Sequence, residues 1–559
     1  MASCNSKESY SSNKPEWNVK PLPEIPKLAA YEFLTRAAKK YPQKPAFISF
    51  DRLTTYQELD ELSNRFANAL IETGIQKGDR VAFYLPNCLQ AIIAFYGIIK
   101  AGAIIVTCNV MLKENELAYQ LKDSGSKAIV TLDRLYPIVE KVKNQTGLEH
   151  TFLTNIRDYS APGARFPPEF EQEKPSQLPA GVEAFASALA KASSGAPGVA
   201  INAQQDLLSI LYTSGTTSLA KGVMLNHYNY CGSSITLPYR QGWKEDDVCL
   251  FLFPVFHVGN HALVLCPSIY MGMTMVNVPK FEAREVLRLI EKYRVTVAHM
   301  PPTAYIGLLN HPDFAKYDLS SLWYCACGGS PLPPALINAW KEKTGVRLLD
   351  AYGCTETSGT APGAAETPVK NREGSAGTTH FEIKIIDQEG KIVPRGTVGE
   401  IFHRGPGVAL GYWNKPEETK EVFIEDGWWR SGDAGYIDED DFVYIVDRYK
   451  DLIVTSGFNV APADVEKVIY NHEAVQEVCV YGVPDAYRVE AVKAAIVLKD
   501  AFKEKVTEQE IIAFCRANMA VYKTPRLVEF VAEIPKTTSG KTLRRLLREK
   551  DAQKGASSK

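Results

Sequence analysis

The chain has 559 residues, of which 45% are hydrophobic and 23% are charged. This composition is typical of a globular protein and excludes a mostly disordered or fibrous chain, and the length corresponds to about three to five domain-sized units. Lys and Arg total 63 against 65 Asp and Glu, a formal net charge of −2. The chain as a whole therefore has no electrostatic attraction to nucleic acid or to an anionic membrane.

Eleven cysteines are scattered from Cys4 to Cys515 without recurring CxxC pairs. This pattern predicts neither a zinc site nor a disulfide framework, and it favours a reducing, cytoplasmic location. Residues 1–27 are polar and Pro-rich and contain no apolar core, so we expect an N-terminal arm and no signal peptide.

From residue 28 to about 150, helical patterns alternate with short apolar strands. The expected elements are helices over 56–73 and 87–100, with Asn87 as an N-cap, and strands over 80–85 and 104–106. The apolar stretch 91–111 has Lys100 in its middle, which indicates a buried helix and strand instead of a membrane span. The alternation is typical of a mostly parallel sheet covered on both faces.

Beyond this region the composition and the predicted elements change several times along the chain. Residues 156–205 are rich in Pro, Ala, Ser and Gly and predict an irregular excursion with one helix over 182–191. The α/β alternation resumes at Leu207, and a small β-rich subdomain is expected over about 376–446. We expect the basic face of a helix over 542–550 to be solvated.

The strongest local signal is a hydroxyl-rich loop that follows the apolar strand 207–211. Such a loop lets the backbone approach a polyphosphate and supplies hydrogen-bond donors and a cation. It is not a Walker A loop, because Ala220-Lys221-Gly222 stands where Gly-Lys-Ser/Thr is required. A flexible polar turn is the alternative. The candidate phosphate-binding residues are Thr213, Ser214, Gly215, Thr216, Thr217 and Lys221.

A second segment, 350–357, carries three candidate groups. Tyr352 can stack on a base and Thr355 can donate a hydrogen bond to a phosphate. Glu356 offers the hard oxygen ligands that Mg²⁺ prefers. The alternative is an ordinary strand-to-turn segment with one exposed acid.

Two further segments lie toward the C-terminus. Asp433 follows a glycine turn, where a carboxylate suits the two hydroxyls of a ribose, and Arg448 is suited to hold a ribose or a phosphate. Lys541 is a further candidate and lies on a Gly-containing turn. A lysine at such a position is usually an ordinary surface residue, which is the alternative. The acidic cluster 438–441 is more typical of a solvated turn than of a metal site.

In order and spacing these four segments resemble the adenylate-forming superfamily, which contains acyl-CoA synthetases, luciferases and non-ribosomal peptide adenylation domains. The resemblance spans about residues 28–549. Further matching segments are 99–106, 399–413, 456–466 and 522–525. It implies an α/β fold with a large N-terminal domain of mixed or parallel sheets flanked by helices, the β-rich subdomain, and a mobile small α+β C-terminal domain. The expected domains are 28–449 and 450–549. They follow the arm 1–27 and precede a tail, 550–559, whose polar, small residues predict disorder.

The resemblance also assigns roles to individual residues. The loop 213–222 would cradle the β- and γ-phosphates of ATP. Lys541, Thr355 and Glu356 would be catalytic, with Glu356 binding Mg²⁺ and Thr217 as a further candidate ligand. The adenine and ribose would be held by Gly329, Asp350, Tyr352, Asp433 and Arg448.

The implied reaction has two steps. A carboxylic acid and ATP give acyl-AMP and pyrophosphate, and CoA then displaces AMP to give a thioester. Between the steps the C-terminal domain would rotate about Lys450. The rotation removes Lys541 from the site and brings in a CoA tunnel at Ser456, Gly457 and Phe458. ATP, Mg²⁺ and CoA are the implied ligands, with no nucleic-acid partner and with a homodimer as one option.

The acyl pocket is expected at mostly small or apolar positions, which predicts an acid that is apolar beyond its carboxylate. These positions are His257, Val258, Cys327, Gly328, Ala351 and Gly353. A medium- or long-chain fatty acid fits, and so does a cyclic or aromatic acid such as cyclohexanecarboxylate or benzoate. His257 is either a gate for the substrate or an ordinary turn histidine.

Two other functions are compatible with these residues. One is a stand-alone acyl-adenylating enzyme that passes acyl-AMP to a carrier protein, and the other is a catalytically silent nucleotide-binding homologue. Four positions depart from the superfamily pattern: Ser218 and Ala220 in the phosphate loop, Asp441 where glycine is usual, and Val489 where glycine often stands. We expect them to alter local geometry but not the class of reaction.

Overall fold

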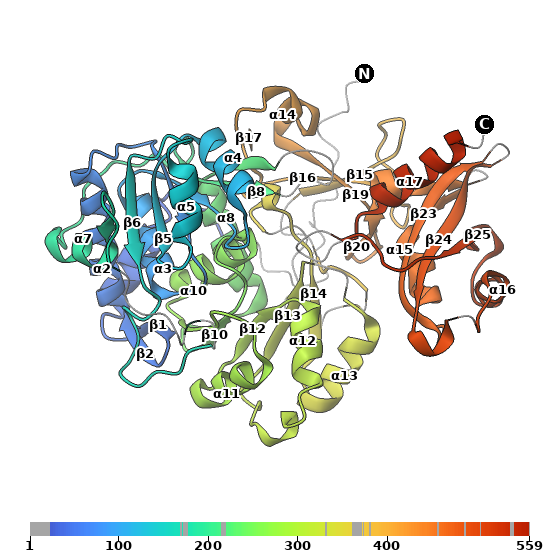
Figure 1. Cartoon of the computed structure of the whole chain (residues 1–559), viewed down its shortest axis with the longest axis horizontal. Helices are drawn as coiled ribbons and strands as arrows, with labels where there is room; N and C mark the ends of the chain where they lie inside the picture. Colours follow the sequence, from blue (N-terminus) through green and yellow to red (C-terminus); the bar gives the residue numbers. More distant parts are fainter. Residues whose placement is uncertain are drawn as a thin grey trace.

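The computed structural model describes residues 23–557 except 168–169, 171–176, 214–219, 330–331, 360–371, 373, 379–381, 456–457, 486–487, 504 and 537–541. Two large sheets with their helices form one side of the molecule, and a C-terminal unit forms the other (Figure 1). A smaller sheet lies between them at the top of this view.

Among the described residues, one large sheet has eight strands in the order β17-β9-β8-β4-β3-β5-β6-β7. They are β3 (Arg80–Tyr84), β4 (Ile104–Thr107), β5 (Ser126–Leu132), β6 (His150–Thr154), β7 (Glu183–Ala184), β8 (Leu207–Thr213), β9 (Lys221–Asn226) and β17 (Gly411–Tyr412). The strands from β3 to β8 pair in parallel, and β9 returns antiparallel to β8. Val81 and Phe83 enter one core, whereas Ala82 and Tyr84 enter another. The sheet is therefore buried on both faces, as the sequence predicts.

The second large sheet has seven strands over the same described part of the chain, in the order β14-β13-β12-β10-β11-β1-β2. They are β1 (Pro45–Ser49), β2 (Arg52–Thr55), β10 (Val248–Phe251), β11 (Thr274–Asn277), β12 (Val297–Met300), β13 (Tyr324–Gly328) and β14 (Leu348–Ala351). Only the β1–β2 pair of this order is antiparallel. The predicted α/β class is confirmed.

Helices fill the space between the two sheets and cover their outer faces. The central core contains side chains of α1 (Glu32–Lys40), α2 (Tyr56–Glu72), α3 (Leu89–Lys100), α7 (Phe185–Lys191), α8 (His227–Gln241) and α10 (Cys266–Met271). The helices α4 (Glu114–Ser124) and α5 (Tyr136–Lys143) pack on the other face of the eight-stranded sheet. The outer face of the seven-stranded sheet is covered by α11 (Ala283–Tyr293), α12 (Pro302–Leu309) and α13 (Pro334–Thr344).

The apolar stretch 91–111 forms buried α3 and β4, as expected. All 12 residues of α3 are buried. Lys100 is one of these residues, and its ammonium donates to Asp60 Oδ1, Ser63 Oγ and Asn64 Oδ1 at 2.7–2.8 Å. Within the described residues, we find no helix with the length and apolar character that crossing a membrane requires.

The prediction that Asn87 caps α3 is wrong. The helix begins at Leu89, and Cys88 is its N-cap residue. The Asn87 amide instead accepts a hydrogen bond from Val255 N at 2.7 Å and donates to Phe253 O at 2.9 Å. The end of β3 is thereby tied to the loop after β10, because backbone groups of a distant segment compete for this side chain.

A smaller antiparallel sheet lies in the segment where the sequence predicts a β-rich subdomain. Its strands are β15 (Glu382–Ile386), β16 (Gly399–Arg404), β18 (Phe423–Ile424), β19 (Trp428–Ile437) and β20 (Val443–Arg448), and α14 (Pro416–Val422) precedes β18. Asp441, which replaces a usual glycine, has a φ of +67°. Asp is one of the few other residues that tolerate this conformation, and its carboxylate pairs with Arg395.

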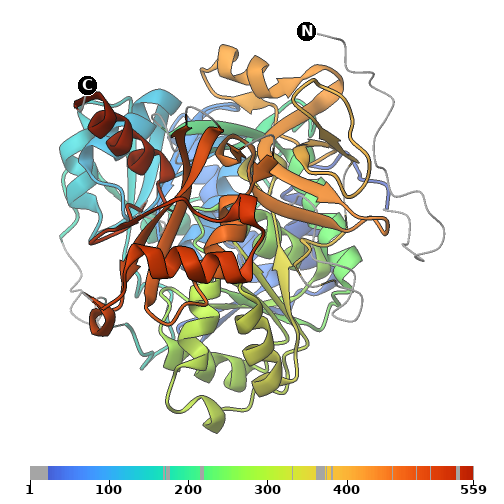
Figure 2. The same ribbon diagram turned by 90° about the vertical axis from the view of Figure 1, so that its right-hand side faces the viewer.

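The C-terminal unit has its own sheet and core, and Figure 2 shows it facing the viewer. Its strands are β21 (Ile453–Thr455), β22 (Phe458–Val460), β23 (Val475–Asp485), β24 (Val489–Leu498) and β25 (Leu527–Phe530). Its helices are α15 (Pro462–Ile469), α16 (Glu508–Asn518) and α17 (Arg544–Ser557). The short helix η6 (Tyr449–Asp451), which contains the predicted hinge residue Lys450, joins this unit to β20.

Two predictions about the C-terminus are wrong. The helix α17 continues to Ser557, so the expected tail 550–559 is helical over most of its length. Asp551 anchors this part, because it accepts hydrogen bonds from Tyr481 Oη and Lys493 Nζ at 2.9 Å each. The basic face of α17 is not simply solvated either. Arg544 pairs with Glu466 at 2.9 Å and Arg548 pairs with Asp451 at 2.8 Å.

Val489 occupies a strained backbone conformation. Its φ is +75°, which a β-branched residue rarely adopts, and 67% of the residue is exposed. Burial therefore does little to offset the strain. We expect Val489→Gly to raise the free energy of unfolding by about 1 kcal/mol, since the left-handed conformation costs an L-residue about 1–2 kcal/mol. The urea-unfolding midpoint measures this change.

A matched control for this prediction is Val497→Gly. Val497 is buried in the same strand and has no positive φ, so its replacement by glycine should lower the midpoint. A lower midpoint for Val489→Gly as well would contradict the strain argument.

Candidate active site

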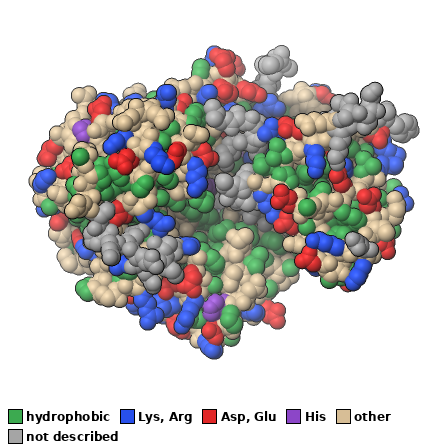
Figure 3. Space-filling view, viewed as in Figure 1, with side chains coloured by type: hydrophobic (Ala, Val, Ile, Leu, Met, Phe, Trp, Pro, Cys, Tyr) green, Lys and Arg blue, Asp and Glu red, His purple; other side chains and the backbone are tan. Residues whose placement is uncertain are grey.

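The predicted site residues gather where strands of the large sheets end. Thr213 is the last residue of β8, Gly328 the last of β13 and Ala351 the last of β14. Because β13 and β14 are parallel neighbours, their carboxyl ends open on the same edge, the usual position for ligands of such sheets. On the face shown in Figure 3 the molecule is hollowed beside the C-terminal unit, and hydrophobic side chains lie in the hollow.

The carboxylate of Asp433 lies at the centre of the described site. Tyr352 Oη donates a hydrogen bond to Asp433 Oδ2, and Arg448 Nη1 lies 2.9 Å from Asp433 Oδ1. The antiparallel register of β19 and β20 sets Asp433 directly opposite Arg448. The Asp433 side chain is only 8% exposed, so the guanidinium offsets the cost of burying its charge. The structure thus brings together three of the residues predicted to hold adenine and ribose.

A layer of buried rings supports Tyr352 from behind. The Tyr352 and His403 ring centroids are 6.2 Å apart, and His403 stacks on Trp429 at 5.8 Å. Burial lowers the pKa of His403 to about 3, so this ring is neutral. Its two ring nitrogens have no hydrogen-bond partner in the described part of the chain. The sequence gives no periodic signal for this layer, because its members come from separate strands.

Glu356 lies in the short helix η4 (Thr355–Thr357) beside β9, the strand that follows the predicted phosphate loop. Tyr412 Oη donates to Glu356 Oε1 at 2.9 Å. The Lys221 ammonium lies 5.0 Å from the centre of the Tyr412 ring, a cation–π distance. Burial raises the pKa of Glu356. Sequence reasoning missed the role of Tyr412, although Tyr412 lies within the matching segment 399–413.

The groups around Glu356 fit Mg²⁺ that binds together with a nucleotide. The described residues contain no cluster of three or more His, Cys, Asp or Glu side chains that could hold a metal ion by themselves. Mg²⁺ in phosphate-transferring sites is commonly held by one or two carboxylates, waters and the substrate phosphates. A single carboxylate near the end of the predicted phosphate loop meets that requirement.

The loop after β14 requires glycine for steric reasons. A Cβ atom on Gly353 would lie 1.9 Å from the carbonyl oxygen of Gly359, so no other residue fits without moving the backbone. Asp350 precedes this loop in β14, and burial raises the pKa of its carboxyl to about 7. Gly329, with a φ of +88°, follows β13 at the same edge.

The expected acyl-pocket residues are only partly grouped. His257 is the N-cap residue of α9 (Val258–Asn260) and accepts a hydrogen bond from Gly259 N at 3.0 Å. The π-helical turn η2 (His261–Leu265) follows, and a Cβ atom on Gly359 would meet Ala262 at 3.5 Å. This turn therefore reaches the loop after β14. Cys327 instead packs in the core beneath α12 and α13, because alternate residues of a strand face opposite sides.

Several predicted site residues lie outside the described residues. They are Ser214, Gly215, Thr216, Thr217, Ser456, Gly457 and Lys541. Phe458 is described only as part of β22. Their roles stay predictions, as do those of Thr355 and Lys450, which the structure places in η4 and η6.

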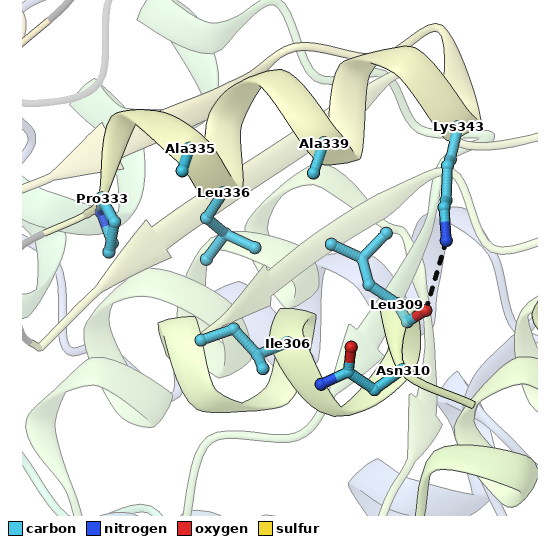
Figure 4. Close-up of a pocket in the computed structure, with 8 residues that line it drawn as sticks. All are labelled: Ile306, Leu309, Asn310, Pro333, Ala335, Leu336, Ala339 and Lys343. Atoms are coloured by element: carbon cyan, nitrogen blue, oxygen red, sulfur yellow. Dashed lines mark hydrogen bonds between the residues drawn. The ribbon is translucent and has the colours of Figure 1, made fainter. Parts of the chain in front are cut away.

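A separate surface groove lies between α12 and α13, with a cavity volume of 370 Å³ (Figure 4). Its lining is mostly apolar, with Ile306 and Leu336 on facing helices and Lys343 at one end. The Lys343 ammonium donates to Leu309 O at 3.4 Å. The groove contains none of the predicted site residues.

Comparisons with known proteins identify the family of the chain. The AMP-binding enzyme family model matches residues 34–413, and the model of the AMP-binding enzyme C-terminal domain matches residues 464–541. The chain is 38% identical over 539 residues to a long-chain-fatty-acid–CoA ligase of Bacillus subtilis (strain 168). The aligned residues cover 95% of this chain and 96% of that protein.

A second relative is the long-chain-fatty-acid–CoA ligase FadD13 of Mycobacterium tuberculosis, which is 33% identical over 92% of this chain and 97% of that protein. Among solved structures, the anthranilate CoA ligase AuaEII in complex with anthranoyl-AMP is 30% identical with a TM-score of 0.80, covering 95% of this chain and 99% of that one. ATP-bound MatB from Rhodopseudomonas palustris is also 30% identical with a TM-score of 0.80, and the match covers 94% of this chain and 99% of that one. The predicted superfamily is confirmed: the chain belongs to the AMP-binding, or adenylate-forming, enzyme family.

Proposed function

We propose that this chain is an AMP-forming ligase that joins a long-chain fatty acid to CoA. The observation that carries the proposal is the Asp433 carboxylate, which is fixed by Tyr352 and Arg448 beside the Glu356 site. This arrangement suits a nucleoside whose ribose hydroxyls donate to Asp433 while its phosphates extend toward Glu356 and Lys221.

In the first step the fatty carboxylate attacks the α-phosphorus of ATP, and pyrophosphate leaves with the electrons of the broken P–O bond. Negative charge builds on the α-phosphate oxygens as the bond forms. Lys541 is assigned to offset this charge, and Thr355 to donate a hydrogen bond to the same group. When bound, Mg²⁺ at Glu356 supplies positive charge to the phosphates. The Asp433 group keeps the ribose fixed, so the α-phosphate stays in line with the attacking oxygen.

In the second step the CoA thiol attacks the acyl carbonyl and AMP leaves. We assign to Lys450 the rotation that exchanges Lys541 for the segment Ser456-Gly457-Phe458. Gly457 has no side chain, so a pantetheine arm can pass close to the backbone there.

A long-chain acid is favoured because the relatives that match most of the chain are named for it. Structural neighbours named for anthranilate and benzoate favour an aromatic acid as the second candidate. The test is incubation with ATP, Mg²⁺ and acetate, hexanoate, palmitate, benzoate or cyclohexanecarboxylate, with and without CoA. We expect CoA-dependent AMP, pyrophosphate and thioester, with palmitate reacting fastest, as measured by mass spectrometry.

Other outcomes of this assay contradict the proposal in distinct ways. Fastest turnover of benzoate would identify an aryl-CoA ligase. Acyl-AMP that accumulates and does not respond to CoA would identify an enzyme that serves a carrier protein. Absence of product from every acid would contradict the activity itself.

We also propose that the enzyme works in the cytoplasm, where ATP and CoA are available. All ten cysteines that the structure describes are unpaired, which fits a reducing compartment. A homodimer stays one option for its assembly, and size-exclusion chromatography with light scattering would measure the mass in solution.

Asp433→Asn should weaken nucleotide use. The amide keeps the side-chain shape but loses the charge that pairs with Arg448 and accepts ribose hydrogen bonds. We expect kcat/KM for ATP to fall about 100-fold, because charged hydrogen bonds contribute about 1.5–3 kcal/mol each. Asp440→Asn is the control, since Asp440 lies in the acidic turn and pairs with Arg372. Equal activity of the two variants would contradict the ribose role.

Lys541→Ala should separate the two half-reactions. We expect acyl-AMP formation to fall about 100- to 1,000-fold, the effect of losing a group that stabilises transition-state charge. Transfer from preformed acyl-AMP to CoA should change little. Lys536→Ala is the control, because Lys536 precedes the same loop and pairs with Glu477 at 2.6 Å. Unchanged pyrophosphate exchange in Lys541→Ala would show that the lysine is wrongly assigned.

A further inference from the structure

Asp447 makes contacts that cross the hinge between the large part of the molecule and the C-terminal unit. It lies in β20, opposite Ala434 of β19, and therefore belongs to the small sheet on the near side of Lys450. Its side chain is only 5% exposed, although it lies three residues before the proposed hinge. Its Oδ1 atom accepts a hydrogen bond from Arg448 N, the next residue of the same strand, at 2.7 Å. Its other contacts reach across Lys450.

The first contact is with the start of α15, the first helix of the C-terminal unit. The N-cap residue of α15 is Ala461, which has no side-chain oxygen to accept a hydrogen bond from the first turn. Asp447 Oδ2 accepts the hydrogen bond from Ala463 N at 3.0 Å instead. A carboxylate in this place satisfies a free N–H group and interacts favourably with the helix dipole. The cap of α15 is thus supplied from the other side of the hinge.

The second contact is with α17, the helix that begins three residues after Lys541. Arg544 Nη1 lies 3.5 Å from Asp447 Oδ1, while Arg544 Nη2 donates to both oxygens of Glu466 at 2.9 Å. The Arg544–Glu466 pair and the Arg548–Asp451 pair lie entirely beyond Lys450 in the sequence. A rotation about Lys450 leaves these pairs intact and breaks the contacts of Asp447 with Ala463 and Arg544, while the bond from Arg448 N stays.

We infer that Asp447 is a positioning residue that latches the C-terminal unit in the orientation seen here. The inference rests on the proposed function, in which the unit rotates about Lys450 between two half-reactions. Rotation away from this orientation removes the cap from α15 and the second carboxylate from Arg544, and the return rotation restores both. These contacts therefore influence the fraction of molecules in each orientation, and with it the relative rates of acyl-AMP formation and thioester formation.

Asp447→Ala removes both contacts that cross the hinge, together with the bond from Arg448 N, and tests the inference. Acyl-AMP formation is followed by pyrophosphate exchange, and thioester formation by single turnover of preformed palmitoyl-AMP with CoA. We expect the half-reaction that uses the latched orientation to slow while the other does not. The ratio of the two rates should change about fivefold or more, the factor that corresponds to loss of one helix cap. Asp447→Asn keeps an oxygen acceptor for Ala463 N and should show a smaller change.

Asp464→Asn is the matched control. Asp464 lies in the first turn of the same helix, but its carboxylate pairs with Lys523 within the C-terminal unit, so the ratio of rates should stay at the wild-type value. A residue that only stabilises the fold would slow both half-reactions equally. An unchanged ratio in a folded Asp447→Ala protein overturns the inference.

Hydrogen exchange gives a readout that does not depend on activity. In the wild-type protein the Ala463 amide is bonded to Asp447, so we expect peptides covering the start of α15 to exchange faster in Asp447→Ala and not in Asp464→Asn. Equal exchange in the wild type and in Asp447→Ala contradicts the latch even if the acid substrate is misassigned. Failure of the wild-type protein to make any thioester contradicts the proposed function alone.

Discussion

The described site depends on one buried interaction, the carboxylate of Asp433 held between the Tyr352 hydroxyl and the Arg448 guanidinium. Each group comes from a different element: Tyr352 follows a strand of the seven-stranded sheet, Asp433 lies in β19, and Arg448 ends β20 two residues before the proposed hinge residue Lys450. A buried carboxylate is costly unless it is paired and hydrogen-bonded. These contacts therefore fix the small sheet against the large one and leave a charged acceptor at their junction.

The register of β19 and β20 links this junction to the C-terminal unit. Asp433 is opposite Arg448 and Ala434 is opposite Asp447, so neighbouring residues of β20 do two jobs. Arg448 completes the proposed ribose site, while Asp447 caps α15 beyond the proposed hinge. Successive residues of a strand face opposite sides, which explains how one short strand contacts the proposed ribose site on one face and the C-terminal unit on the other.

The sequence predicted much of this arrangement because its signals are local. Hydrophobic alternation predicted β3, β4 and the helices that pack on them, and the motif order predicted Tyr352, Asp433 and Arg448 as one site. The misses are tertiary. Asn87 is bonded to a loop about 170 residues away, and no local pattern indicates that. The helix α17 extends past residue 550 because Tyr481 and Lys493 hold Asp551. Likewise, His403 and Tyr412 contribute through pairings between distant strands.

The central claim is that the fatty carboxylate is activated when it attacks the α-phosphorus of ATP in this site. The most direct measurement uses palmitate labelled with ¹⁸O in its carboxyl group, with ATP, Mg²⁺ and CoA, and mass spectrometry of the products. The claim predicts one ¹⁸O atom in AMP, transferred when CoA cleaves the acyl-AMP, and none in pyrophosphate. Label in pyrophosphate or in inorganic phosphate, or unlabelled AMP beside labelled thioester, would contradict it.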